Sequence, residues 1–302
     1  MLNDIHCHFF STKFYASLGG EKAITALGWD APGTSDALAD RWVAELDRAG
    51  VSRATLIASI PGDAASVGAA VRRHRDRFVG FFMLDPTKAG APDEAAAAID
   101  NDGLRGICLY PAMHRFSIQD ERARKVLEVA AARPGTAVFV HCGVLSIGVR
   151  KKLGLPNSFD IRFSNPLLLN AVAIAYPSVP IVIPHFGAGL FREALMLADL
   201  CPNVVFDTSS TNGWIRYHPG LTLEAVFKTA LSVVGPDRLI FGTDSSFFPR
   251  GWVRDVYEQQ SAVLDALEVE ADVRERVFGG NFDRLFPRVP KHTDETVRMK
   301  AV

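Results

Sequence analysis

LNDIHCHFF (residues 2–10) is an apolar, strand-like run that carries two histidines one residue apart. Successive side chains of a β-strand point to opposite faces, so we expect His6 and His8 on one face and Cys7 on the other. Two imidazoles side by side on one face either crowd each other or share a bound group. The rest of the sequence has to decide between these two readings.

Seven further short apolar runs, rich in β-branched residues, follow along the chain. They cover residues 51–59, 78–84, 104–110, 136–142, 180–186, 203–209 and 238–244. Alanine- and leucine-rich segments with helical spacing, such as residues 36–50 and 120–135, lie between them. Nearly all-apolar strands are typical of a parallel sheet that is covered on both faces. The alternation predicts an α/β fold, a (β/α)8 TIM barrel.

We expect residues 1–287 to form this barrel as one domain, and residues 288–302 to form a polar tail. Two long βα loops are predicted, one after the first strand (9–34) and a basic one after the fifth (143–165). A doubly wound open sheet is the alternative fold. Against it, no GxGxxG motif follows the first strand, and polar residues end many strands instead of gathering at one switch point.

Composition narrows the classes of partner and location. The chain of 302 residues is 48% hydrophobic and 22% charged, with a formal net charge of −1. This balance gives no electrostatic reason to expect nucleic acid or a membrane surface as partner. The four scattered cysteines form no CxxC pair. We therefore expect reduced thiols in a cytoplasmic protein that binds a small molecule, and a homodimer is left open.

Polar residues stand at the ends of four predicted strands. The first strand ends in His6 and His8, the fifth in His141, the sixth in His185 and the eighth in Asp244. The carboxyl ends of barrel strands meet at one mouth, so these side chains should converge there. A single histidine could be structural, and Asp244 could cap a following turn. Together, imidazoles and a carboxylate predict a divalent metal site.

The set of strand-end residues resembles the amidohydrolase superfamily, in particular its amidohydrolase-2 branch, which includes aminocarboxymuconate-semialdehyde decarboxylase-like enzymes. RLIFGTDSSFFP (238–249) and VFGGNFDRLFP (277–287) are similar to that branch's eighth-strand and terminal-helix signatures. The resemblance implies metal ligation by His6, His8, His141 and Asp244, with His185 beside the metal as a polarising or proton-transferring group. Imidazole and carboxylate donors suit a divalent ion, zinc first, with manganese, iron or nickel as alternatives.

The number of metal ions depends on the fourth strand. Some members of the superfamily bind two metals through a carboxylated lysine or a glutamate there. This strand reads LRGICLYP (104–111) and contains no lysine. A mononuclear site is expected, and a bridge from Cys108 is left open.

Such a site predicts hydrolysis of an ester, lactone or amide by a metal-activated water, with Asp244 taking the proton and His185 assisting. The alternative is a non-oxidative decarboxylase, a carboxy-lyase, on the same metal. A metal-free lactonase and a barrel nuclease or phosphoesterase are weaker readings. For substrate contacts we expect Arg250, which could clamp a carboxylate, and four aromatic residues. These are Phe9, Tyr110, Trp214 and Phe247; His114 and His218 are secondary candidates.

Overall fold

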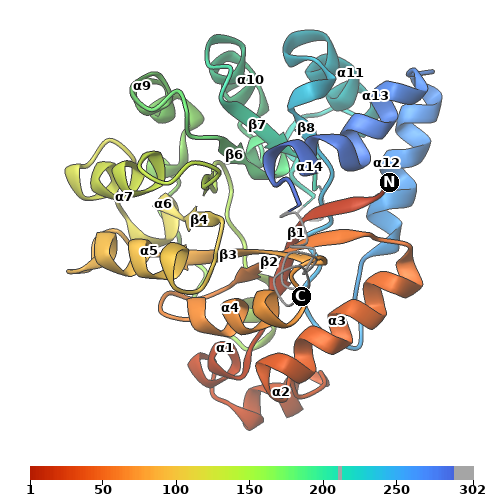
Figure 1. The fold of residues 1–302 in the computed structure, drawn as a ribbon. Helices are drawn as coiled ribbons and strands as arrows, with labels where there is room; N and C mark the ends of the chain where they lie inside the picture. Colours follow the sequence, from red (N-terminus) through yellow and green to blue (C-terminus); the bar gives the residue numbers. More distant parts are fainter. Residues whose placement is uncertain (210–212, 289–302) are drawn as a thin grey trace, which may run out of the picture.

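Eight parallel strands in sequence order form the centre of the protein, in a computed structural model that describes residues 1–209 and 213–288 (Figure 1). The strands are β1 (Asn3–Phe9), β2 (Arg53–Ala58), β3 (Phe78–Leu84), β4 (Gly106–Leu109), β5 (Ala137–Val140), β6 (Ile181–Ile183), β7 (Val204–Asp207) and β8 (Leu239–Ile240). The predicted single-domain (β/α)8 barrel is confirmed. Of the expected tail, all but Arg288 lies outside the described residues.

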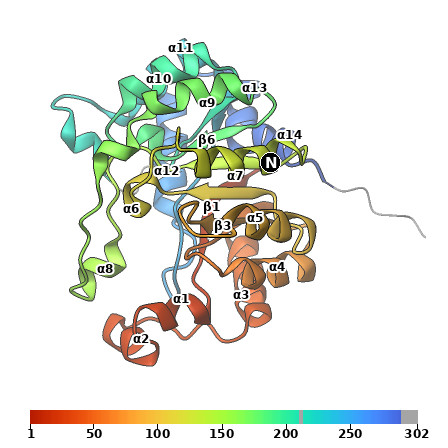
Figure 2. The same cartoon turned by 90° about the vertical axis from the view of Figure 1, so that its left-hand side faces the viewer.

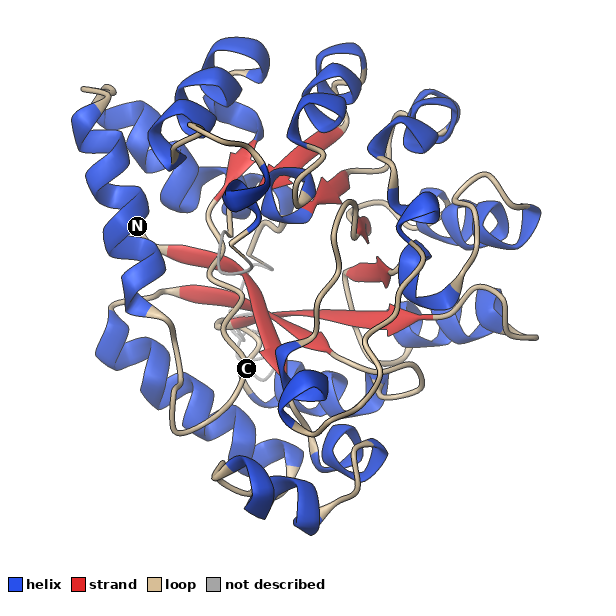
Figure 3. Ribbon diagram, turned by 180° about the vertical axis from the view of Figure 1, so that it is seen from behind, coloured by secondary structure: helices blue, strands red, loops and turns tan. Residues whose placement is uncertain are grey.

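Helices surround the strands, as Figure 3 shows from behind. The helices before β5 are α1 (Thr12–Ser17), α2 (Glu21–Leu27), α3 (Ser35–Ala49), α4 (Ala64–Arg73), α5 (Ala91–Asp100), α6 (Pro111–His114) and α7 (Glu121–Ala131). Those after it are α8 (Gly148–Lys152), α9 (Asn170–Ala175), α10 (Phe191–Leu200), α11 (Leu223–Val234), α12 (Arg254–Ala266), α13 (Ala271–Glu275) and α14 (Asn281–Leu285). None of the described helices is long and apolar enough to cross a membrane.

The barrel closes where β1 meets β8. Ile5 donates its backbone N–H to Phe241 at 3.0 Å, and His8 donates to Ser245 at 2.6 Å. The buried Asp4 carboxylate strengthens this seam, because it accepts hydrogen bonds from the Thr243 hydroxyl at 2.6 Å and the Trp252 indole at 2.7 Å. Burial raises the pKa of Asp4 to about 6, although these hydrogen bonds oppose the shift.

A β-bulge in β1 decides which of its side chains enter the barrel. Asp4 pairs with Ala54, but Cys7 pairs with Leu56, so β1 has one extra residue in this interval. The bulge reverses the alternation of side chains along the strand. Ile5 belongs to the barrel interior, and so does His6, whose ring meets that of Phe139 edge-on. Cys7 and Phe9 instead face the surrounding helices.

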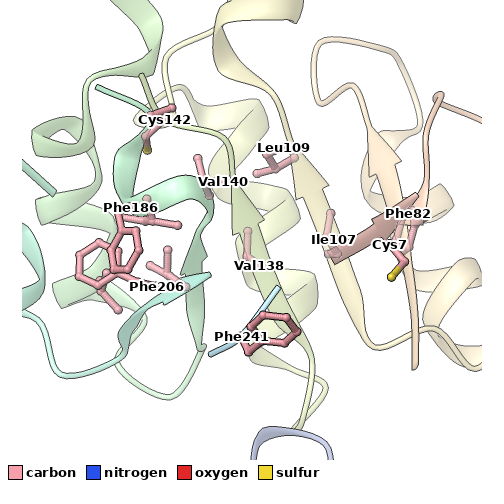
Figure 4. Close-up of a cluster of buried hydrophobic side chains, with 14 of the residues drawn as sticks. Cys7, Phe82, Ile107, Leu109, Val138, Val140, Cys142, Phe186, Phe206 and Phe241 are labelled. Atoms are coloured by element: carbon pink, nitrogen blue, oxygen red, sulfur yellow. The ribbon is translucent and has the colours of Figure 1, made fainter. Parts of the chain in front are cut away.

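The apolar core has two layers. One lies between the strands and the helices, and Figure 4 shows part of it, including Cys7, Phe82, Ile107 and Phe206. The other fills the barrel interior, where Phe81 and Phe139 are joined by Phe282 from α14. The helix α14 closes the amino-terminal end of the barrel, so the opposite end is the one that can hold a site.

The two predicted long loops extend from the carboxyl ends of β1 and β5. Figure 2 shows α1, α2 and α8 on the same side of the barrel. They share a small apolar cluster in which Phe14, Tyr15 and Val149 are buried. The loops therefore pack against each other beside the mouth.

We predict that Asp4→Asn destabilises the fold by roughly 1–3 kcal/mol, because an amide nitrogen would face donors that now meet a carboxylate oxygen. The midpoint of urea unfolding measures the change. Asp199→Asn, at an exposed position near the carboxyl end of α10, is the matched control and should leave the midpoint nearly unchanged. Equal midpoints for the two variants would contradict this role for Asp4.

Candidate functional site

Four histidines gather at the carboxyl end of the barrel. His6 and His8 lie on β1, His141 directly follows β5, and His185 lies in the short 3₁₀ segment η3 (Pro184–Gly187) after β6. The His6 ring centre is 5.0 Å from that of His8 and 5.1 Å from that of His185. The ring centres of His141 and His185 are 5.5 Å apart. The predicted convergence of strand ends is thus present in the structure.

Three ligand atoms come closest together. The Nε2 atoms of His6 and His8 are 3.2 Å apart. Oδ1 of Asp244 lies 3.5 Å from the first and 3.2 Å from the second. Within the described residues, these donors form one of two groups compact enough to hold a metal ion, and the other is His6, His185 and Asp207.

The opposite nitrogens of the two β1 histidines are held by side chains from other strands. Nδ1 of His6 lies 2.6 Å from Oδ2 of Asp207, a carboxylate that can only accept. Nδ1 of His8 lies 2.8 Å from the hydroxyl of Ser59, and that hydroxyl donates to the carbonyl of Ile57. Both Nδ1 atoms therefore carry the hydrogen, and both Nε2 atoms turn their lone pairs toward Asp244.

The charges around His6, His8 and Asp244 favour a cation between these residues. Burial alone would lower the pKa of His6, but the charges of Asp207 and Asp244 outweigh it and raise the pKa to about 9. Burial alone would raise the pKa of Asp244, but its histidine neighbours hold that pKa far below the usual value. Without a metal, that pKa leaves a proton on Nε2 of His6 near neutral pH, and this proton supplies the positive charge beside Asp244. A divalent cation would replace the proton and take both Nε2 lone pairs and the carboxylate. The donor set fits a divalent metal ion such as zinc.

His141 and His185 stand slightly apart from this triangle. His141 is buried, its ring lies against that of Tyr110, and its Nδ1 has no hydrogen-bond partner among the described residues. Burial lowers the pKa values of both His141 and His185, so both imidazoles are neutral near neutral pH. Neutral imidazole is the form that can ligate a metal or accept a proton.

Strained backbone and glycines make room for the site. His185 and Asp244 have φ values of 56° and 59°, in the left-handed region that non-glycine residues seldom adopt. Gly242 stands where a Cβ atom would lie 2.3 Å from Oδ1 of Asp207 and 3.1 Å from Cβ of His6. This close approach explains the glycine of the FGTD stretch.

Three polar residues of the site escaped the sequence analysis. Asp207 ends β7, Ser209 follows it, and Ser59 follows β2; all three are buried. The rule that selected the histidines, a polar side chain at the end of a strand, also applies to FDTS (206–209) and IAS (57–59). Applied to every strand, it would have found them.

The predicted substrate contacts divide into two groups. Tyr110 lies in the barrel interior beside His141. Phe247 stacks on Trp29 with ring centres 3.7 Å apart, and the exposed Arg250 guanidinium lies 4.5 Å from the Phe247 ring centre. These three side chains remain candidates for contact with a substrate.

The predicted substrate contacts of Phe9 and Trp214 are corrected by the structure. Phe9 is fully buried and Trp214 is 1% exposed, and both belong to the layer between strands and helices. Phe9 lies on the same side of β1 as Cys7, opposite His6 and His8, and Trp214 packs against Phe191. Of the secondary candidates, His218 bonds to the carbonyl of Gly189, and His114 is half-buried. Cys108 belongs to neither compact donor group.

Comparison with solved structures supports the fold. 5-Carboxyvanillate decarboxylase LigW from Sphingomonas paucimobilis is 15% identical, with a TM-score of 0.63 over 95% of this chain and 99% of that one. A probable 2-pyrone-4,6-dicarboxylic acid hydrolase from Acinetobacter baumannii is 16% identical, with a TM-score of 0.64 over 94% and 98%. A Burkholderia multivorans amidohydrolase with bound zinc is 17% identical, with a TM-score of 0.59 over 94% and 98%.

Sequence comparison identifies the family. Protein fluG of Emericella nidulans is 31% identical over 93 residues, which are 31% of this chain but only 10% of that protein. A family model described as amidohydrolase (Amidohydro_2) matches residues 4–288, nearly the whole barrel. The chain therefore belongs to the amidohydrolase family, in its amidohydrolase-2 branch.

Proposed function

We propose that the protein is a metal-dependent hydrolase of a small, carboxylate-bearing or aromatic compound. One observation carries this proposal: two imidazole Nε2 atoms with fixed lone pairs and the Asp244 carboxylate meet within 3.5 Å of one another at the barrel mouth. We propose His6, His8, His141 and Asp244 as metal ligands. A divalent ion held there supplies a water of lowered pKa and polarises a substrate oxygen.

The chain's own residues would handle the protons. Asp244 is ionised and lies in the mouth, so it can accept a proton from an attacking water. His185 is neutral and buried next to His6, so it can hydrogen-bond a substrate oxygen or carry a proton to the leaving group. Hydrolysis of an ester, lactone or amide needs both roles.

Positive charge at the entrance supports an anionic substrate. Two cations approach the stacked rings of Trp29 and Phe247: Lys152 is 5.7 Å from both ring centres, and Arg250 is 4.5 Å from that of Phe247. The structure shows no ion pair for either cation among the described residues. A guanidinium there can bind a carboxylate in bidentate fashion, and flat rings favour a planar substrate body.

A non-oxidative decarboxylase is the second candidate. The decarboxylase LigW, similar over nearly the whole chain, favours it, because the same barrel carries that reaction. His185 is only 4% exposed, so a proton that it delivers to carbon would meet little competing water. The ligand set suits either reaction.

Zinc is the proposed metal, because a set of imidazoles with one carboxylate suits it, and manganese, iron or nickel are alternatives. We propose a small-molecule partner, without nucleic acid or membrane, and a cytoplasmic location. The four free, buried cysteines support that location. A homodimer is consistent with these proposals.

We predict that zinc- or manganese-loaded protein opens a carboxylated lactone such as 2-pyrone-4,6-dicarboxylate without releasing carbon dioxide. Ultraviolet absorbance follows ring opening, and a coupled assay follows carbon dioxide, with 5-carboxyvanillate as the parallel substrate. Chelator-treated protein is the control and should be inactive. Carbon dioxide release in the absence of hydrolysis would select the decarboxylase instead. Full activity of metal-free protein would refute both candidates.

We predict that His141→Ala and Asp244→Asn each lose the bound metal and the activity while the barrel stays folded, because each variant removes a ligand. Metal analysis of the purified variants and far-ultraviolet circular dichroism test this. Asp199→Asn, at an exposed position in α10, should keep its metal. Retention of a full metal equivalent in either ligand variant would exclude that residue as a ligand.

We predict that Asp207→Asn weakens zinc binding by about 10- to 100-fold, because His6 would lose the carboxylate that fixes its tautomer. Competition with a chromogenic chelator measures the affinity. Asp199→Asn again serves as the control. An unchanged zinc affinity would show that the Asp207–His6 contact does not tune the site.

A further inference from the structure

One buried hydroxyl, that of Ser209, lies between Asp207, which holds His6, and His185, the proposed proton-transfer residue. Its Oγ atom is 2.9 Å from Oδ2 of Asp207 and 2.8 Å from Nδ1 of His185. It also lies 3.3 Å from Nδ1 of His6. Ser209 is fully buried, so water does not compete for these contacts. The hydroxyl thus joins the residue that fixes His6 to the proposed proton-transfer residue.

The direction of each hydrogen bond follows from the partners. The Asp207 carboxylate can only accept, so the Ser209 hydroxyl donates its hydrogen there. The lone pairs of that hydroxyl are left to face Nδ1 of His185, and the backbone carbonyl of Ser209 faces the same nitrogen at 3.0 Å. Two acceptors around one nitrogen require that the nitrogen carry a hydrogen.

The opposite arrangement is unfavourable. If Nδ1 of His185 were bare, the Ser209 carbonyl would face a lone pair at 3.0 Å. The hydroxyl would have to turn its hydrogen to His185, and Oδ2 of Asp207 would then lose a donor. Both changes would leave buried acceptors in contact, which costs free energy.

The backbone fixes Ser209 in place. Its N–H donates to Oδ1 of Asp207 at 2.9 Å, so both carboxylate oxygens of Asp207 hold the same residue. A hydroxyl restrained in this way can orient a neighbouring ring, and the ring of His185 sits on strained backbone that needs such restraint.

We propose that Ser209 is a positioning residue that keeps His185 in the Nδ1–H tautomer and couples its orientation to the Asp207–His6 pair. Nε2 of His185 is then the nitrogen that exchanges protons with a substrate. Only the statement that His185 exchanges protons with a substrate rests on the proposed function. The tautomer and the coupling can be measured without any substrate.

The test compares zinc-loaded wild-type protein with Ser209→Ala and Ser209→Thr by ¹⁵N NMR of labelled histidine, with a His185→Asn sample to assign the signals. In the wild type, Nδ1 of His185 should give the protonated, pyrrole-type shift. In Ser209→Ala the backbone carbonyl of Ser209 still accepts from Nδ1 but the hydroxyl is lost. The share of the second tautomer should therefore rise and the two nitrogen shifts should move part of the way toward each other, and Ser209→Thr should restore the wild-type pattern.

Ser59→Ala is the matched control, because it removes the hydroxyl that serves His8 and should leave the His185 shifts in place. Once a substrate is known, Ser209→Ala should lower kcat by about 10- to 100-fold with metal content and KM unchanged. Unaltered His185 shifts in Ser209→Ala would overturn the proposal. So would equal shifts in Ser59→Ala and Ser209→Ala, since the effect would then not be specific. If the zinc-loaded wild type turned over none of the candidate substrates while the His185 shifts behaved as expected, the proposed function would be refuted and the role of Ser209 would stand.

Discussion

The seam between the first and last strands is the constraint on which the other features of the site depend. β1 and β8 are the two ends of the sheet, and the buried carboxylate of Asp4 ties them together through Thr243 and Trp252. The same seam sets His6 and His8 on one side and Asp244 on the other, within hydrogen-bond range. A barrel that failed to close here would open its interior apolar layer, to which Ile5 and Ile240 belong, and would separate the three atoms that face one another. The interaction that completes the fold therefore also assembles the site.

In His6 and His8, the hydrogen bond made by Nδ1, which faces away from the mouth, fixes the protonation of Nε2, which faces it. Asp207 and Ser59, from β7 and the end of β2, hold Nδ1 of His6 and His8 and so direct both Nε2 lone pairs inward. Such outer partners fix the tautomer and raise the basicity of a ligating imidazole. Gly242 belongs to the same arrangement, because any side chain there would collide with Asp207. The site thus also depends on β2 and β7, which carry none of the proposed ligands, through short, buried contacts.

Periodicity and strand-end polarity were enough to predict the barrel, its two long loops and the four gathered histidines. They failed where local geometry departs from a regular strand. The bulge in β1 lets the neighbouring residues Ile5 and His6 both point into the barrel, which simple alternation does not predict. Phe9 lies in the helix-facing layer with Cys7, as alternation from His6 and His8 requires, so the expected substrate contact at Phe9 was misplaced. β6 ends at Ile183, earlier than expected, because Pro184 has no N–H for the ladder and the backbone then turns left-handed. Asp207 was visible in the sequence, but its importance depends on a partner 201 positions away.

The proposed catalytic residues lie at strand ends, whereas most side chains proposed to bind the substrate lie on loops. Every proposed ligand and proton carrier lies on a strand or within a few residues of its end, where the packed barrel fixes it. The aromatic and cationic side chains at the entrance come from the loops after β1, β5 and β8: Trp29, Lys152 and Phe247. Loops tolerate substitution far better than buried strand ends do. A change of substrate within this architecture therefore requires changes in those loops, while a change of metal chemistry requires disturbing the buried network around His6.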